Sequence, residues 1–258
     1  MPGPSTPTSV PPSRARSLLV PGLLLLAVVA LGLAAFAGTT DEDAPAGEAP
    51  SGEQTSDAPS GEQTGDAEAA REAGEQLTRR DPDDPRALGD ADAPIVMIEW
   101  SDFQCPFCAS FALETMPELV DEYVDDGTLR FEWRDFPVLG EDSMTAAMAG
   151  QAAAQQGAFF EMHDEIFARE WERNTGELSI ESLTEVAGEL GLDSDRFEQD
   201  MQDPDLEQAV RADLQLGQQL GFTGTPAFVI NGRSMIGGQP TDTFRQVIDQ
   251  AAAEAGVS

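Results

Sequence analysis

The chain contains two cysteines, Cys105 and Cys108, with two residues between them. An apolar run that ends at Trp100 precedes them, and a segment with apolar residues at helical spacing follows. At this spacing one sulfur can attack a substrate disulfide while the other displaces the product. Every disulfide that the chain forms within itself involves this pair, so the fold has to set the pair between a strand and a helix.

From about residue 86 onward the pattern predicts a mixed α/β domain. Apolar runs bounded by turn residues predict strands at 94–100, 129–136, 227–231 and, after an Asn231-Gly232 hairpin turn, 233–236. Apolar residues at helical spacing predict helices at 107–123, at 142–201 with breaks at 174–176 and 191, at 205–220 and at 242–253. The predicted order is strand, Cys-x-x-Cys, helix, strand, helices, strand, turn, strand and helix.

This order resembles the thioredoxin fold with a helical insertion, as in the DsbA-like disulfide oxidoreductases. The resemblance covers about residues 88–258 and rests on WSDFQCPFC at 100–108, GTPAF at 224–228 and FFEMHD at 159–164. It implies a thioredoxin domain over 88–258 with a helical insertion at about 140–220. It also implies a redox-active Cys105–Cys108 disulfide in place of any cofactor or metal.

Thiol–disulfide exchange requires a thiolate, and a free cysteine with a pKa of about 8.5 is mostly protonated at neutral pH. Cys105 directly precedes a predicted helix, where unpaired N–H groups and the helix dipole can bring a thiol pKa to about 3.5–7. We therefore expect Cys105 to be the exposed, attacking sulfur and Cys108 to be the buried resolving thiol. Pro106 suits the first helical turn, where its missing N–H is not required.

Glu99 lies six residues before Cys105 on the predicted strand. A buried carboxyl there has a raised pKa and can exchange a proton with the Cys108 thiol. DsbA-like proteins carry an acid at the matching position, so the resemblance implies the same role. The alternative is an exposed strand glutamate in an acidic protein.

The resemblance further implies a cis peptide bond before Pro226, which would bring Thr225 against the cysteines and let its backbone pair with an extended substrate. Thr225, Pro226, Pro106 and Phe107 are the expected substrate-binding residues. Phe107 departs from the Pro-His dipeptide of the most oxidising family members, in which the histidine stabilises the thiolate. The reduction potential is therefore expected anywhere between about −120 mV, as in DsbA, and about −270 mV, as in thioredoxin.

Two other interpretations of the cysteine pair are open. Zinc needs four ligands, and His163 is the single histidine of the chain, so carboxylates would have to complete a site. A purely structural disulfide across a four-residue loop would remove little loop-closure entropy. His163 itself lies in an apolar helical run, which favours packing or surface placement over catalysis.

The chain is strongly acidic, with 48 Asp and Glu against 14 basic residues, all of them Arg, for a net charge of −34. Such a surface repels phosphates, so no nucleic-acid binding through a basic patch is expected. The bias runs through the whole chain, which favours solvation or adaptation to high salt over one specific basic partner.

Residues 18–38 form an uncharged apolar run of 21 residues, about 31 Å long as a helix at 1.5 Å per residue, which matches a hydrocarbon core. An uncleaved anchor and a cleaved signal peptide are both compatible with this run. Arg14 and Arg16 predict that residues 1–17 are cytoplasmic. The protein would then be a single-pass cell-membrane protein, and the domain that follows the span would lie outside the cytoplasm.

Residues 39–87 are expected to form a disordered acidic linker, since they contain almost no aromatic or branched apolar residues. The nine residues at 49–57 recur almost unchanged at 58–66. A short helix is compatible with residues 67–77.

Three functions fit these features. The first is an extracytoplasmic thiol:disulfide oxidoreductase that forms disulfides in cysteine-containing secreted or cell-surface proteins. By family analogy, a quinone-linked membrane enzyme would reoxidise it. The second is a disulfide reductase or isomerase on the same fold, and the third is a non-catalytic peptide-binding or chaperone module, which would not need two thiols at this spacing.

Overall fold

A five-stranded sheet forms the centre of the domain in the computed structural model, which describes residues 62–257. The strand order is β1-β3-β2-β4-β5, with bounds Ala87–Leu88, Leu129–Asp135, Ile95–Ser101, Ala227–Ile230 and Arg233–Ile236. β2 is parallel to β3 and antiparallel to β4, and both outer strands are antiparallel to their neighbours. The sequence pattern predicts every strand except β1, which has only two residues.

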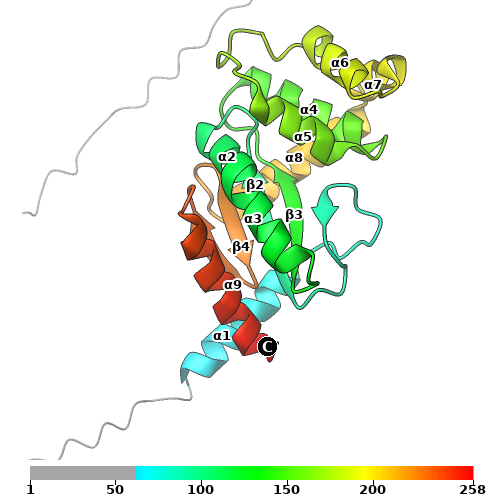
Figure 1. Ribbon diagram of the computed structural model, residues 1–258. Coiled ribbons are helices and arrows are strands. Elements are labelled where there is room, and N and C mark those ends of the chain that lie inside the picture. Colours follow the sequence, from blue (N-terminus) through cyan, green and yellow to red (C-terminus); the bar gives the residue numbers. More distant parts are fainter. Residues whose placement is uncertain (1–61, 258) are drawn as a thin grey trace, which may run out of the picture. The chain divides into compact units, whose positions relative to one another are not determined.

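Helices cover both faces of this sheet (Figure 1). On one face, α9 (Thr241–Ala255) and the helical stretch after the cysteines enclose an aromatic cluster that includes Phe111 and Phe228. On the other face, Trp100 of β2 packs in a separate apolar cluster with Leu214 of α8. The two central strands β2 and β3 are buried along their whole length, as expected for strands covered on both faces.

The helix that follows the cysteines is continuous but irregular. It runs through α2 (Pro106–Ser110), a π-helical turn at Phe111–Thr115, α3 (Met116–Leu119) and a second π-helical turn at Val120–Val124. Pro117 breaks the regular hydrogen-bond pattern without ending the helix, because a proline has no backbone N–H to donate. The predicted helix at 107–123 is therefore confirmed, and its irregular turns are an addition that periodicity does not predict.

The helical insertion lies between β3 and β4, where the sequence predicts it. Its helices are α4 (Glu141–Ala154), α5 (Phe159–Ala168), α6 (Ile180–Glu189), α7 (Ser194–Asp200) and α8 (Pro204–Gln219). The predicted breaks at 174–176 and 191 are present, and a further break separates α4 from α5. Gly157 in that break has a φ of 73°, a left-handed conformation that glycine adopts without steric cost.

Residues before 88 also belong to the folded domain, and those before 62 lie outside the described residues. The helix α1 spans Glu62–Glu75, and the segment 77–86, which we call the N-terminal strap, is bonded to β3. The prediction of a disordered linker over 39–87 is therefore wrong from residue 62 onward.

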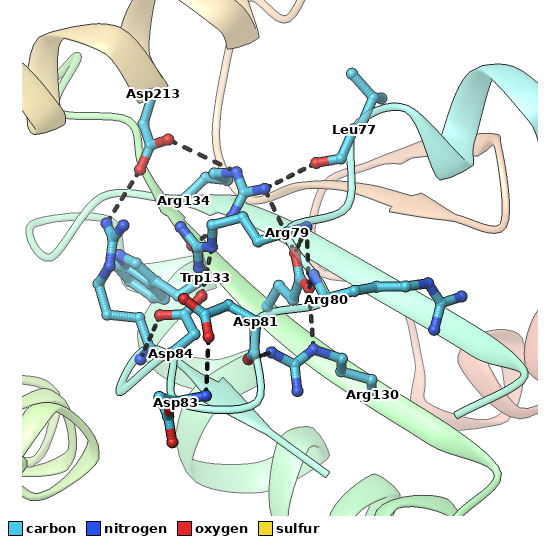
Figure 2. Close-up of polar contacts among 12 residues, drawn as sticks. Leu77, Arg79, Arg80, Asp81, Asp83, Asp84, Arg130, Trp133, Arg134 and Asp213 are labelled. Atoms are coloured by element: carbon cyan, nitrogen blue, oxygen red, sulfur yellow. Dashed lines mark hydrogen bonds and ion pairs between the residues drawn. The ribbon is translucent and has the colours of Figure 1, made fainter. Parts of the chain in front are cut away.

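Buried charges on β3 hold the N-terminal strap in place (Figure 2). The Glu132 carboxylate accepts the backbone N–H of Arg79 at 2.9 Å and that of Arg80 at 3.0 Å. The Arg79 guanidinium donates to the Trp133 carbonyl at 2.8 Å, and Arg134 donates to the carbonyl of Leu77 at 2.8 Å. Leu77 is the one large apolar residue of the strap and packs against the apolar cluster around Trp100, while the polar groups that follow it find buried partners on β3.

No helix between residues 62 and 257 is long and apolar enough to cross a membrane. The predicted span at 18–38 and the preceding residues 1–17 lie outside the described residues, and the anchor stays a prediction.

Candidate redox site

Cys105 caps the helix α2 at the carboxyl end of the loop that leaves β2. Its backbone is extended, and its sulfur accepts the backbone N–H of Cys108 at 3.4 Å. Pro106 follows as the first helical residue, as predicted. The residue is less exposed than expected, at 4% for Cys105 against 0% for Cys108. The expected exposed sulfur is therefore corrected to a nearly buried one.

The two thiols have very different acidities, although both are free in this structure. A hydrogen bond with the Cys108 thiol, a contact with Thr225 and the backbone N–H groups of Cys108 and Phe107 together lower the pKa of Cys105 to about 6, against the opposing effect of burial. Burial, the same bond to Cys105 and the nearby Glu99 raise the pKa of Cys108 well above its usual range. At neutral pH the pair therefore holds one thiolate, on Cys105.

Glu99 lies on the face of β2 that carries the cysteines, at 1% exposure. Neither carboxyl oxygen has a hydrogen-bond partner among the described residues. Burial raises the pKa of Glu99 to about 8, against the opposing effect of the nearby Ser101 hydroxyl and with a further contribution from the charge on Cys105. The carboxyl is thus protonated at neutral pH beside a thiol that has to gain and lose a proton, and the alternative of an exposed strand glutamate is wrong.

The loop before β4 closes the site from the opposite side. The Thr225–Pro226 peptide bond is cis, as the resemblance implies, and the Cys105 sulfur lies 3.4 Å from the Thr225 carbonyl oxygen. Phe107 is 63% exposed, so its ring is available to a partner. Thr225 therefore lies against the sulfur of Cys105, and Phe107 presents an exposed ring two residues after it.

A polar clasp that the sequence does not predict joins the site to the helical insertion. The buried Asp102 carboxylate accepts the backbone N–H groups of Val138 and Leu139 at 2.8 and 2.9 Å. Gln104 accepts the backbone N–H of Asn174 at 2.9 Å. Asp102 and Gln104 stand between the strand and Cys105, but their partners are far away in the sequence, so no local pattern predicts them.

His163 is fully buried, and its ring packs edge-on against Trp133 and Phe167. Burial lowers its pKa, which favours the neutral ring. Of the two predicted placements, in the packed core or on the surface, the structure shows the packed core. Within residues 62–257 no three His, Cys, Asp or Glu side chains gather as metal ligands would.

Comparisons with known proteins agree with this geometry. The family model described as thioredoxin matches residues 81–250. The probable disulfide bond formation protein D of Bacillus anthracis is 29% identical over 169 residues, which are 64% of this chain and 77% of that protein. The α-DsbA1 structure of Wolbachia pipientis superimposes with a TM-score of 0.62 at 28% identity, over 70% of this chain and 96% of that one.

A Na⁺/H⁺ antiporter of Salinispora tropica, NhaA 3, is 32% identical over 169 residues, but these are only 24% of that protein, so its activity is not carried over.

The chain belongs to the thioredoxin family and is a DsbA-like thiol:disulfide oxidoreductase.

Proposed function

We propose that the Cys105–Cys108 pair is the redox centre and that it forms disulfides in cysteine-containing secreted or cell-surface proteins. The observation that carries this proposal is the difference between the two thiols, with a pKa of about 6 at Cys105 and a much higher one at Cys108. A stable thiolate in the reduced pair makes the reduced form favourable, and such a pair is an oxidant.

The proposed reaction starts with the Cys105–Cys108 disulfide. A substrate thiolate attacks the Cys105 sulfur, a mixed disulfide forms, and Cys108 leaves as a thiolate that takes a proton from Glu99. The second substrate thiolate then attacks the substrate sulfur of the mixed disulfide and releases Cys105 as a thiolate. Two electrons pass from the substrate to the pair, which ends reduced.

The residues around Cys105 would hold the substrate during these steps. The Thr225–Pro226 backbone can pair with an extended segment, and Phe107 and Pro106 offer an apolar surface next to the sulfur. The reduced pair then needs an electron acceptor, for which the family resemblance suggests a quinone-linked membrane enzyme. The apolar run at 18–38 supports a place at the membrane with the domain facing outward.

A redox titration of the full chain tests the direction of electron flow. We expect a reduction potential between about −270 mV and about −120 mV, because the Cys105 thiolate is stabilised more than in thioredoxin, with its pKa of about 7, and less than in DsbA, with its pKa of about 3.5. The fraction of alkylated thiols at equilibrium with glutathione gives the value. A potential at or below about −270 mV would contradict the oxidase function and favour the reductase.

The substitution Glu99→Gln is expected to slow the steps in which Cys108 gains or loses a proton by about tenfold or more. In the wild-type protein these rates should change near pH 8, where Glu99 ionises. Glutamine does not titrate, so the variant should lack this inflection. Rapid-mixing kinetics of mixed-disulfide formation between pH 6 and 9.5 would measure both effects.

Protein stability provides the control for this variant. The pKa of Glu99 is about 8 in the folded protein and about 4.3 in an unfolded chain, so wild-type stability falls as the pH rises between these values. Glutamine removes this loss, and the variant should be about 2–4 kcal/mol more stable at pH 7. A well-folded variant with an unchanged pH profile would remove Glu99 from the mechanism.

A further inference from the structure

A cavity of about 300 Å³ opens beside the nucleophilic cysteine, on the side of the helical insertion. Cys105 and Pro106 form one wall. The facing wall belongs to the end of α5 and the loop that follows it, residues 169–173. Apolar side chains line most of the space, and the loop adds three charged ones, Arg169, Glu170 and Arg173.

The two arginines differ in their partners. Arg169 is paired, with its guanidinium 2.9 Å from the carboxylate of Glu165 and 2.5 Å from that of Glu189. Arg173 has no carboxylate within ion-pair distance among residues 62–257. In that part of the chain every other arginine except Arg71 has one. In a protein with 48 acidic residues, a cation left without a partner beside the reacting sulfur is available to a ligand.

The polar clasp fixes the loop that carries Arg173. The neighbouring Asn174 exchanges two hydrogen bonds with Gln104, at 2.9 and 3.2 Å, and donates a third to the Leu139 carbonyl at 2.7 Å. Asn174 has a φ of 55°, a left-handed conformation that these bonds stabilise. Since Gln104 directly precedes Cys105, the clasp ties the position of Arg173 to that of the reacting sulfur.

We propose that Arg173 binds a carboxylate on the substrate, so that the enzyme prefers cysteines with an acidic residue nearby in the peptide. This inference rests on the proposed function of the Cys105–Cys108 pair. The net charge of −34 repels acidic peptides as a whole, and Arg173 offsets that repulsion where the substrate sulfur has to approach. Basic peptides need no such group, because the overall field already attracts them.

The test uses the full chain and three peptides that differ only in the residue beside a cysteine pair, which is Glu, Gln or Arg. The second-order rate of exchange is measured with each peptide at low salt, and the quantity of interest is the ratio of the Glu to the Gln peptide. Arg173→Gln should lower this ratio about fivefold, and Arg173→Glu should lower it further and raise the rate of the Arg peptide. In the wild type the ratio should fall as salt screens the pair.

Arg71→Gln is the matched control, because Arg71 is also exposed and without an ion-pair partner among the described residues, but does not line the cavity. It should keep the wild-type ratio. If Arg173→Gln slowed exchange with the Glu and Gln peptides by the same factor, or did not slow it at all, the ratio would be unchanged and the proposal would be overturned.

The rates behind each ratio are measured in both directions of the reaction, as oxidation of the peptide dithiol and as reduction of the peptide disulfide. A failure of the oxidase function changes which direction is faster. A failure of this inference removes the charge preference in both directions, so the two failures are distinguishable.

Discussion

Replacing Cys105 with serine is expected to abolish thiol–disulfide exchange, with a loss of at least about 1000-fold in rate. At pH 7 a thiol with a pKa of about 6 is roughly nine-tenths thiolate, and the thiolate is the reactive species. Cys108 cannot take over, because it is fully buried and its pKa is raised far above neutrality. The release of thionitrobenzoate from its symmetric disulfide measures the rate directly.

The matched control is Cys108→Ala, which keeps the attacking sulfur and removes the resolving one. This variant should still release one equivalent of thionitrobenzoate and then stop at a stable mixed disulfide, visible as an added mass on Cys105. If Cys105→Ser retained a tenth of the wild-type rate, or if Cys108→Ala formed no mixed disulfide, the assignment of the two sulfurs would be wrong.

The sequence predicts those parts of the site that depend on residues close to one another along the chain. The Cys108 thiol, three residues on, is the first cause of the lowered pKa of Cys105, and the backbone N–H groups of Cys108 and Phe107 at the start of the helix add to it. The alternation of side chains along β2 sends Glu99 to the same face as the cysteines, so its burial follows from the strand itself. The expected exposure of Cys105 was wrong, because the Thr225–Pro226 loop that covers it is 120 residues away in the sequence.

The N-terminal strap shows why the remainder could not be predicted. Its sequence, Arg-Arg-Asp-Pro-Asp-Asp-Pro-Arg over 79–86, has the composition of a disordered segment. Alternation along β3 suggests that Arg130, Glu132 and Arg134 face solvent, yet each is at most 3% exposed. Only the pairing of these two charged segments buries both, and no local sequence signal reports such a pairing.

Glu132 is the residue on which the strap depends most, and Glu132→Gln is expected to lower the free energy of unfolding at pH 7 by about 3–5 kcal/mol. Its carboxylate accepts two backbone N–H groups of the strap and pairs with the buried guanidinium groups of Arg130 and Arg134. Without the negative charge Arg130 has no carboxylate partner among residues 62–257, and Arg134 keeps only the more distant Asp213 at 3.6 Å. Such a loss is a large fraction of the 5–15 kcal/mol that stabilises a typical domain. Denaturation in urea measures the change.

The dependence on pH separates this effect from a loss of packing. Burial alone would raise the pKa of Glu132, but the bonds from Arg79, Arg80 and Arg130 outweigh it and hold the pKa below its ordinary value. A carboxyl with a lowered folded pKa stabilises the protein above about pH 4.3, and this stabilisation is lost as the pH falls through the folded value. The difference in the free energy of unfolding between the wild type and Glu132→Gln should therefore become smaller in acid. A packing defect would leave this difference the same at every pH.

Glu207→Gln is the surface control, since Glu207 forms an exposed ion pair with Arg211 one turn along α8. It should change stability by no more than about 0.5 kcal/mol. Limited proteolysis gives a second measurement, because loss of the Glu132 carboxylate should release residues 77–86 and open them to cleavage before the domain unfolds. A Glu132→Gln variant that matched the surface control in stability, and whose strap stayed resistant to protease, would show that the buried cations hold the strap without the carboxylate between them.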